Sequence, residues 1–213
     1  MKKILLFASA LAGLFFAASC QQENLEPVAG GNTVTYTVQL PDAIGTKAIG
    51  TNVSSVTELI YEVYRIDENG EEMRLYQMTE GMTDGSATVK LELVNNQNFR
   101  VLFWAQVPGK GIYNTENLSA VTLSDTYTVV SSGDFEAFFG SDHVTDGTIS
   151  ENGGNIGLIR AVSQLNIATE SLNDQTISKV DVTVSGISKT FNVMDGDCVM
   201  DGNCEEVSPD AAV

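Results

Sequence analysis

Apolar and polar residues alternate along much of the chain, which is the pattern of strands with one buried face. In residues 33–40 every second residue is apolar, beginning with Val34 and ending with Leu40. Residues 87–93 alternate in the same way between Ala87 and Leu93. Because successive side chains of a strand point to opposite faces, both stretches are predicted to be half-buried strands.

One stretch is apolar on both alternating faces. Within Phe99–Val107, Arg100 and Gln106 are the polar residues. A strand with two apolar faces is typical of the middle of a layered fold. We therefore predict a central strand, with Trp104 in the core rather than on an exposed ligand-binding surface.

Turn-forming residues separate the predicted strands at intervals of roughly 8–12 residues. Residues 67–70 (Asp-Glu-Asn-Gly) predict a hairpin that joins a strand at Val56–Ile66 to one at Met73–Met78. Further turns are expected at residues 84–85, 95–98 and 108–111.

The second half of the chain is predicted to hold shorter elements. Phe135, Phe138 and Phe139 fall at near-helical spacing, which predicts a helical turn over Asp134–Phe139. Strands are expected at Leu118–Leu123, Thr126–Val130, Ile156–Thr169, Ile177–Ile187 and Phe191–Val193. Since no long amphipathic helix is visible, the pattern predicts an all-β fold, an antiparallel β-sandwich of about eight to ten strands.

The N-terminal residues have the composition of a secretory signal. Lys2 and Lys3 precede the apolar run Ile4–Phe16, and Ala17-Ala18-Ser19 leads directly to Cys20. This order is typical of a bacterial lipoprotein, so we expect cleavage before Cys20 and attachment of palmitate-type acyl chains to it. Several acyl chains would hold the protein stably on a membrane. An ordinary secreted protein, cut nearby, is the alternative.

These features divide the chain into four predicted parts. Residues 1–19 are the signal peptide, 20–32 a polar tether, 33–193 the β-sandwich domain and 194–213 a turn-rich, partly disordered tail. The formal net charge is −17. Such a surface repels nucleic acid and anionic lipid headgroups, so the acyl chains, and not electrostatics, would attach the protein to a membrane.

Two cysteines remain once Cys20 is assigned to lipid. In an exported protein, Cys198 and Cys204 are a candidate disulfide. They end the similar segments Met194–Cys198 and Met200–Cys204, each of which contains an Asp-Gly pair. A calcium loop and two Asp-Gly turns are both possible interpretations. The spacing departs from the helix–loop–helix calcium pattern, which favours the turns.

Residues suited to catalysis form no recognisable constellation. His143 is the single histidine and is predicted to lie in a loop, where it makes a poor metal site or triad. Residues 153–157, which are rich in glycine, precede a predicted strand rather than a helix, unlike a nucleotide-binding loop. We therefore expect a protein that is not an enzyme, without a cofactor, metal site or catalytic residue.

Four stretches carry a family resemblance. They are residues 45–48, residues 59–64, residues 101–106 followed by 112–114, and residues 158–169. In this order, between about Val34 and Phe191, the chain resembles the Bacteroidota fimbrillin-like lipoproteins, which include fimbrial subunits. The resemblance implies a transthyretin-like, Greek-key β-sandwich on the outer membrane surface, with a role in a fimbrium or in cell adhesion.

The resemblance also implies a mode of assembly. In pilin-like members a protease removes the lipid end and the first strand at a basic residue, and the opened groove accepts a strand from a neighbouring subunit. Lys47 is the basic candidate here. Because the chain shows no second sandwich, and residues 208–213 do not resemble a donor strand, we expect a lipid-anchored fimbrial anchor or accessory subunit. A glycan-binding surface lipoprotein of a polysaccharide uptake system is the alternative, and it would need exposed aromatic residues.

Overall fold

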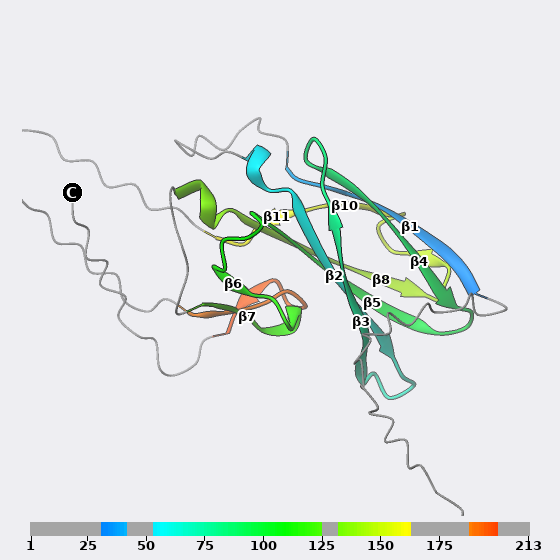
Figure 1. The fold of residues 1–213 in the computed structure, drawn as a ribbon. Helices are drawn as coiled ribbons and strands as arrows, with labels where there is room; N and C mark the ends of the chain where they lie inside the picture. The colour runs from blue at the N-terminus through cyan, green and yellow to red at the C-terminus, as the bar shows by residue number, and fades with distance from the viewer. Residues whose placement is uncertain (1–30, 42–52, 125–131, 163–187, 200–213) are drawn as a thin grey trace, which may run out of the picture.

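The computed structural model describes residues 31–41, 53–124, 132–162 and 188–199 (Figure 1). These residues form thirteen strands and three short 3-10 helices, and they contain no α-helix. The longer strands are β1 (Gly31–Gln39), β2 (Glu58–Ile66), β3 (Glu72–Gly81), β4 (Ser86–Val94), β5 (Asn98–Gln106) and β8 (Ala137–Thr145). The shorter strands are β6 (Tyr113–Asn114), β7 (Val121–Leu123), β9 (Ile149–Ser150), β10 (Asn155–Gly157), β11 (Ile159–Arg160), β12 (Thr190–Asn192) and β13 (Asp197–Cys198). The 3-10 helices are η1 (Val53–Ser55), η2 (Leu118–Ala120) and η3 (Ser132–Phe135).

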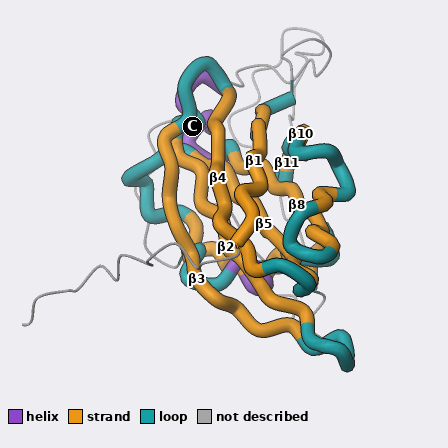
Figure 2. Tube along the Cα trace, turned by 90° about the vertical axis from the view of Figure 1, so that its right-hand side faces the viewer, coloured by secondary structure: helices purple, strands orange, loops and turns teal. Residues whose placement is uncertain are grey.

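The strands form three sheets. Sheet A has the order β10-β1-β4, and sheet B has the order β11-β8-β5-β2-β3, with β9 paired to β8. Sheet C has the order β13-β12-β7-β6. Figures 1 and 2 show β1 and β4 of sheet A crossing over the long strands of sheet B. The predicted all-β sandwich is confirmed, and the small sheet C is an addition that the sequence did not predict.

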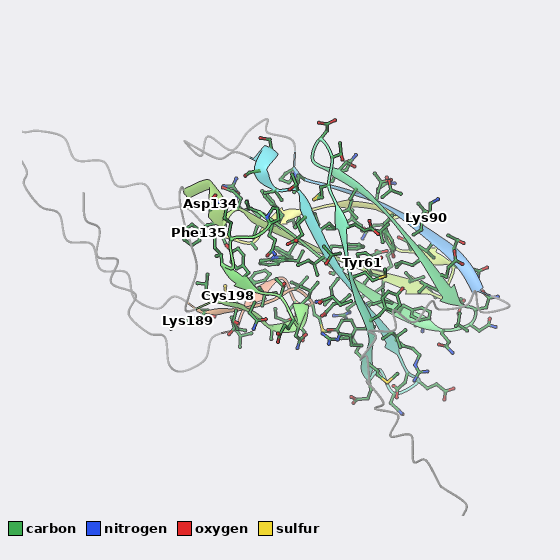
Figure 3. All side chains as sticks on the ribbon, in the orientation of Figure 1. Tyr61, Lys90, Asp134, Phe135, Lys189 and Cys198 are labelled. Atoms are coloured by element: carbon green, nitrogen blue, oxygen red, sulfur yellow. The ribbon has the colours of Figure 1, made fainter. Side chains whose placement is uncertain are left out.

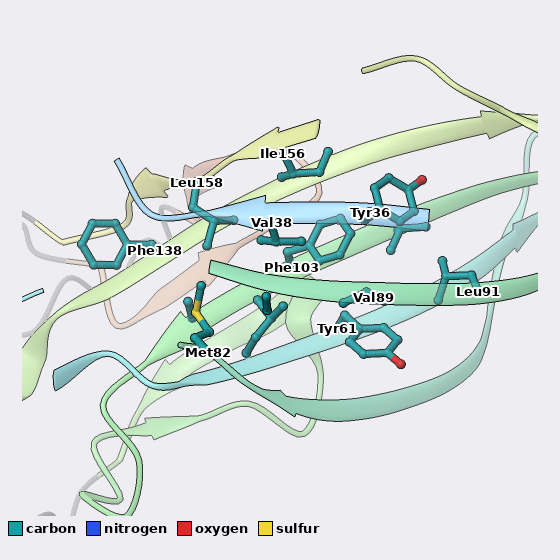
Figure 4. Packing of buried hydrophobic residues seen from close by; sticks show 14 of the residues in the cluster. Tyr36, Val38, Tyr61, Met82, Val89, Leu91, Phe103, Phe138, Ile156 and Leu158 are labelled. Atoms are coloured by element: carbon teal, nitrogen blue, oxygen red, sulfur yellow. The ribbon is translucent and has the colours of Figure 1, made fainter. Parts of the chain in front are cut away.

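The main core lies between sheets A and B. Strands β1 and β4 alternate between buried and exposed residues, as their sequences predict. Their buried side chains meet those of Phe99, Val101 and Phe103 from β5. Figure 4 shows this packing, with Tyr36 and Val38 of β1 beside Phe103. Alternate side chains of β1, β4 and β5 therefore form the interior of the sandwich.

Strand β5 is buried on both faces, as predicted. Its odd-numbered residues from Phe99 to Ala105 belong to the core between sheets A and B. Leu102 and Trp104 point the other way and join a second core with Val121 and Val193, which lie in and beside sheet C. Sheet B is therefore the middle layer, and Trp104, with 1% of its surface exposed, is a core residue.

The structure corrects three local predictions. The helical turn expected over Asp134–Phe139 is wrong beyond η3, because Phe138 and Phe139 lie on β8. This strand pairs with β5 over eight positions, and such tertiary pairing overrides a local spacing of aromatic residues. His143 is consequently on a strand and not in a loop. Antiparallel pairing throughout is also wrong, because β1 runs parallel to β10.

Two boundaries also differ from the prediction. The stretch expected as one strand from Ile156 contains the short strands β10 and β11, and its residues from 163 onward lie outside the described residues. The region assigned to a tail contains β13, which pairs with β12. The predicted strands at 126–130 and 177–187 also lie outside the described residues.

Candidate functional site

Strand β1 joins the two other strands of sheet A. It pairs with β4 over nine positions, from Gly31 opposite Val94 to Gln39 opposite Ser86. On its other side it pairs with β10 over three positions. In the described part of the chain, β4 and β10 are connected within sheet A only through β1. Removing β1 would therefore leave a strand-wide groove between them.

The inward face of β1 contributes a row of core side chains. Val34, Tyr36, Val38 and Leu40 are all buried. The Tyr36 ring meets the Phe103 ring edge-on, with 5.3 Å between the centroids. Full burial of an aliphatic or aromatic side chain stabilises a fold by about 1.5–3 kcal/mol. A strand that replaced β1 would need a similar row of side chains.

The Tyr36 hydroxyl reaches a buried carboxylate. It donates a hydrogen bond of 2.9 Å to Asp142 Oδ2, and Asp142 is 3% exposed. Asp142 also accepts bonds from Ser150 Oγ and from the backbone and side-chain nitrogens of Asn152. Burial, and then the charge of Asp142, raise the pKa of Tyr36 well above its ordinary value. Tyr36 therefore stays a hydrogen-bond donor throughout the physiological pH range.

A glycine permits the close approach of β1 to the turn before β10. Thr37 N donates to Gly154 O at 2.7 Å. A Cβ atom on residue 154 would lie 2.4 Å from Thr35 O. The φ angle of Gly154, +78°, is a second reason for glycine at this position. From the sequence, this glycine-rich stretch was considered only as a nucleotide-binding loop, which it does not match. In the structure this stretch packs against β1 and accepts a hydrogen bond from it.

A second buried carboxylate lies on the opposite face of sheet B. Glu62 is fully buried and accepts hydrogen bonds from Tyr64, Arg74, Gln77 and the backbone of Leu118. The Arg74–Glu62 ion pair has an N–O distance of 2.7 Å. Because these donors come from β2, β3 and η2, Glu62 ties η2, which lies between β6 and β7 of sheet C, to sheet B. We assign it a structural role.

His143 belongs to a polar cluster on the same face. Arg100 Nε donates to His143 Nε2 at 3.0 Å and also lies 3.0 Å from Glu72 Oε1. His143 Nδ1 lies 3.5 Å from Glu151 Oε2. The histidine is thus held between an arginine and a carboxylate rather than next to a nucleophile. Within the described ranges, no group of three His, Cys, Asp or Glu residues is placed to hold a metal ion.

The residues predicted as sites fall mostly outside the described part of the chain. This is true of Cys20, Lys47 and Cys204. Cys198 is exposed and lies on β13 (Figure 3). Because Cys204 is outside the described residues, their disulfide stays a prediction. Asp195 and Gly196 form the predicted turn between β12 and β13, in which Gly196 has a φ of +67°. No helix of the described residues is both long and apolar enough to cross a membrane.

Neither Asp142 nor Glu62 was predicted from the sequence as a site residue. Both are acidic residues on strands, and neither belongs to a motif. The single signal for Glu62 was its position inside an otherwise apolar run, residues 59–64. Only the pairing of distant strands shows that hydrogen-bond donors surround each carboxylate.

Comparison with known proteins places the chain in a family. A search of the curated proteins finds no match. A family model matches residues 26–208, which include all of the described strands. The chain therefore belongs to that family, which is described as a family of unknown function, DUF6562.

Proposed function

We propose that this protein is a lipid-anchored surface protein with a structural or adhesive role, and that it assembles by accepting a strand from a partner subunit in the place of β1. The lipid is attached to Cys20, and the protein is exposed on the outer membrane. In its intact form it is held at the membrane by its lipid and has not yet entered an assembly. After a cut between β1 and β2, near Lys47, it is an accessory subunit held by the strand of its neighbour.

The position of β1 is the observation that supports this proposal most strongly. The strand lies between the lipid attachment site and residues 42–52, so a single cut would free it together with the lipid. It lies between β4 and β10, so its loss would expose two strand edges at once. Unpaired edges and a row of empty apolar pockets are what an incoming strand requires.

A glycan-binding role is the second candidate, and it would need aromatic faces open to solvent. Trp104 is buried and packs edge-on against Tyr113, with centroids 5.3 Å apart. It also lies near Phe191 within the second core. The ring of Trp104, the strongest aromatic candidate for sugar stacking, is therefore covered by other side chains. For this reason we favour the assembly role.

A disulfide that locks β1 in place tests the proposal. Thr35 and Lys90 face each other across β1 and β4, and both are exposed. Facing residues of antiparallel strands have Cα atoms about 4.5–5.5 Å apart, within the range that a disulfide spans. We propose the double variant Thr35→Cys, Lys90→Cys, with Thr35→Cys alone as the matched control.

The assay is incorporation of the tagged protein into high-molecular-weight surface assemblies of the cells that naturally make it. The locked variant should fail to enter the assemblies, whereas the single variant, which keeps β1 free to leave, should enter them normally. Incorporation of the locked variant at the level of the control would show that β1 does not leave. Retention of the intact protein on polysaccharide gels would instead support the glycan-binding alternative.

A further inference from the structure

The ring and the hydroxyl of Tyr36 both contact residues of sheet B. The Tyr36 ring packs against the ring of Phe103 on β5. The Tyr36 hydroxyl donates to Asp142 of β8, which is fixed by Ser150 of β9 and by Asn152. Ser150 is in turn fixed by the backbone nitrogen of Gly154, at 2.9 Å. Apart from Tyr36, these donors to Asp142 lie on β9 and in the turn before β10, so none of them is removed together with β1.

Departure of Tyr36 would leave Asp142 with three of the four donors that the described residues provide. Its Oδ2 atom would keep the short bond from Ser150 and lose the one from Tyr36. A phenylalanine would fill the space against Phe103 but has no group to donate. Burying a charged acceptor without one of its donors costs more than the same loss for a neutral acceptor. The β1 position therefore distinguishes tyrosine from phenylalanine.

The same contact sets the register of the strand. The other residues of this inward row, Val34 and Val38 of β1 and Leu40 directly after it, are all aliphatic. A shift of one residue would turn this row to solvent, but a shift of two would keep it inside. A shift of two would place Val34 or Val38 against the Asp142 carboxylate. The hydrogen bond to Asp142 is the feature that penalises this slip.

We propose that Asp142 selects the strand that occupies the β1 position, and that it favours an extended segment with a tyrosine between two aliphatic residues, each two positions away. This inference rests on the proposed function, because it concerns the strand that replaces β1. The partner is thereby described by chemistry: apolar side chains at alternate positions, with a phenolic hydroxyl at one of them. A donor strand with only aliphatic side chains in this row is a poor match.

The experiment uses the full chain with a cleavage site for a sequence-specific protease inserted between residues 42 and 52. After the cut, the N-terminal piece stays bound through β1 until a competitor displaces it. The competitors are a synthetic peptide of residues 31–41 and the same peptide with Tyr36→Phe. Displacement is followed by native mass spectrometry as a function of peptide concentration.

The tyrosine peptide should displace the N-terminal piece at a concentration about tenfold lower than the phenylalanine peptide, since a hydrogen bond to a charged group corresponds to at least this factor. In a cut chain that carries Asp142→Asn, the difference should fall to about fivefold or less, because the acceptor is then neutral and its hydrogen bond contributes about 1 kcal/mol. If that variant does not fold, the comparison of the two peptides on the unchanged chain still tests whether the β1 position prefers tyrosine to phenylalanine.

The outcomes separate the two proposals. Equal displacement by both peptides would overturn the role of Asp142 and leave strand replacement standing. No displacement by either peptide, even at saturating concentration, would overturn strand replacement itself and this inference with it. A tenfold preference that persists unchanged in the Asp142→Asn chain would place the selectivity elsewhere and refute the assignment to Asp142.

Discussion

Replacement of Trp104 by alanine should strongly destabilise the protein. The indole is 1% exposed, packs against Tyr113 and Phe191, and donates from Nε1 to Gln106 Oε1 at 3.0 Å. Loss of a packed tryptophan side chain costs about 3–5 kcal/mol, because transfer free energy is lost and a cavity remains. For a chain of this size, 1 kcal/mol shifts the melting temperature by about 2–4 °C. We therefore expect a decrease of roughly 6–20 °C.

The assay is thermal unfolding followed by near-ultraviolet circular dichroism, together with denaturant titration. Trp104→Phe keeps a ring in the second core and should lose much less stability than Trp104→Ala. Leu75→Ala is the surface control, because Leu75 is 42% exposed on β3, and it should change the free energy of unfolding by less than about 0.5 kcal/mol. If Trp104→Ala kept the wild-type melting temperature but lost binding to a polysaccharide, both the layered core and the assembly role would be refuted.

Three further predictions follow from single features. Cys20→Ser should release the protein from the membrane fraction or leave it as an uncut precursor; unchanged fractionation with an unchanged mature mass would exclude acylation. Arg74→Met should lower the free energy of unfolding by about 1.5–3 kcal/mol, because Glu62 loses its charged donor. The double variant Arg74→Met, Glu62→Gln should lose less than the sum of the two single changes, whereas strict additivity would show that the pair does not interact. Burial raises the pKa of Tyr36, Tyr61, Tyr64 and Tyr76, that of Tyr76 to about 12. These tyrosines contribute fully to stability below their ordinary pKa of 10.0, and this contribution is lost as the pH rises through their raised pKa values. The free energy of unfolding should therefore fall between about pH 10 and pH 12 and not at lower pH. A flat profile in this range would contradict the burial of these hydroxyls.

Strands with one buried face were predictable because the period of two is written directly in the chain. Val34 to Leu40 and Ala87 to Leu93 alternate in the sequence and alternate in burial. The apolar run around Trp104 predicted a middle strand for the same reason. The strong turn at Asp67–Gly70 joins β2 and β3, as its residues indicated.

Strand β8 could not be predicted in this way. Its sequence, Ala137–Thr145, mixes aromatic, small and charged residues and has no clean alternation. Asp142 and His143 are consecutive residues of β8. Asp142 is buried beneath Tyr36 and the turn before β10, whereas His143 accepts a hydrogen bond from Arg100. These environments come from β1 and β5, which are remote in the chain, so local pattern carries no signal for them.

The candidate site was predictable only in outline. The family resemblance predicts that the first strand leaves, and this stays a prediction; the structure locates that strand between β4 and β10. The parallel pairing with β10, the glycine at residue 154 and the carboxylate under Tyr36 all depend on a connection of over 100 residues. No periodicity reports contacts at that separation.

The mass and the first residue of the protein isolated from cells decide whether β1 is removed during assembly. The membrane fraction should contain a chain that begins at Cys20 and carries acyl groups, and chains recovered from surface assemblies should begin between residues 42 and 52. A chain that starts at another residue with an unmodified Cys20, or an assembled chain that still contains β1, would contradict this expectation.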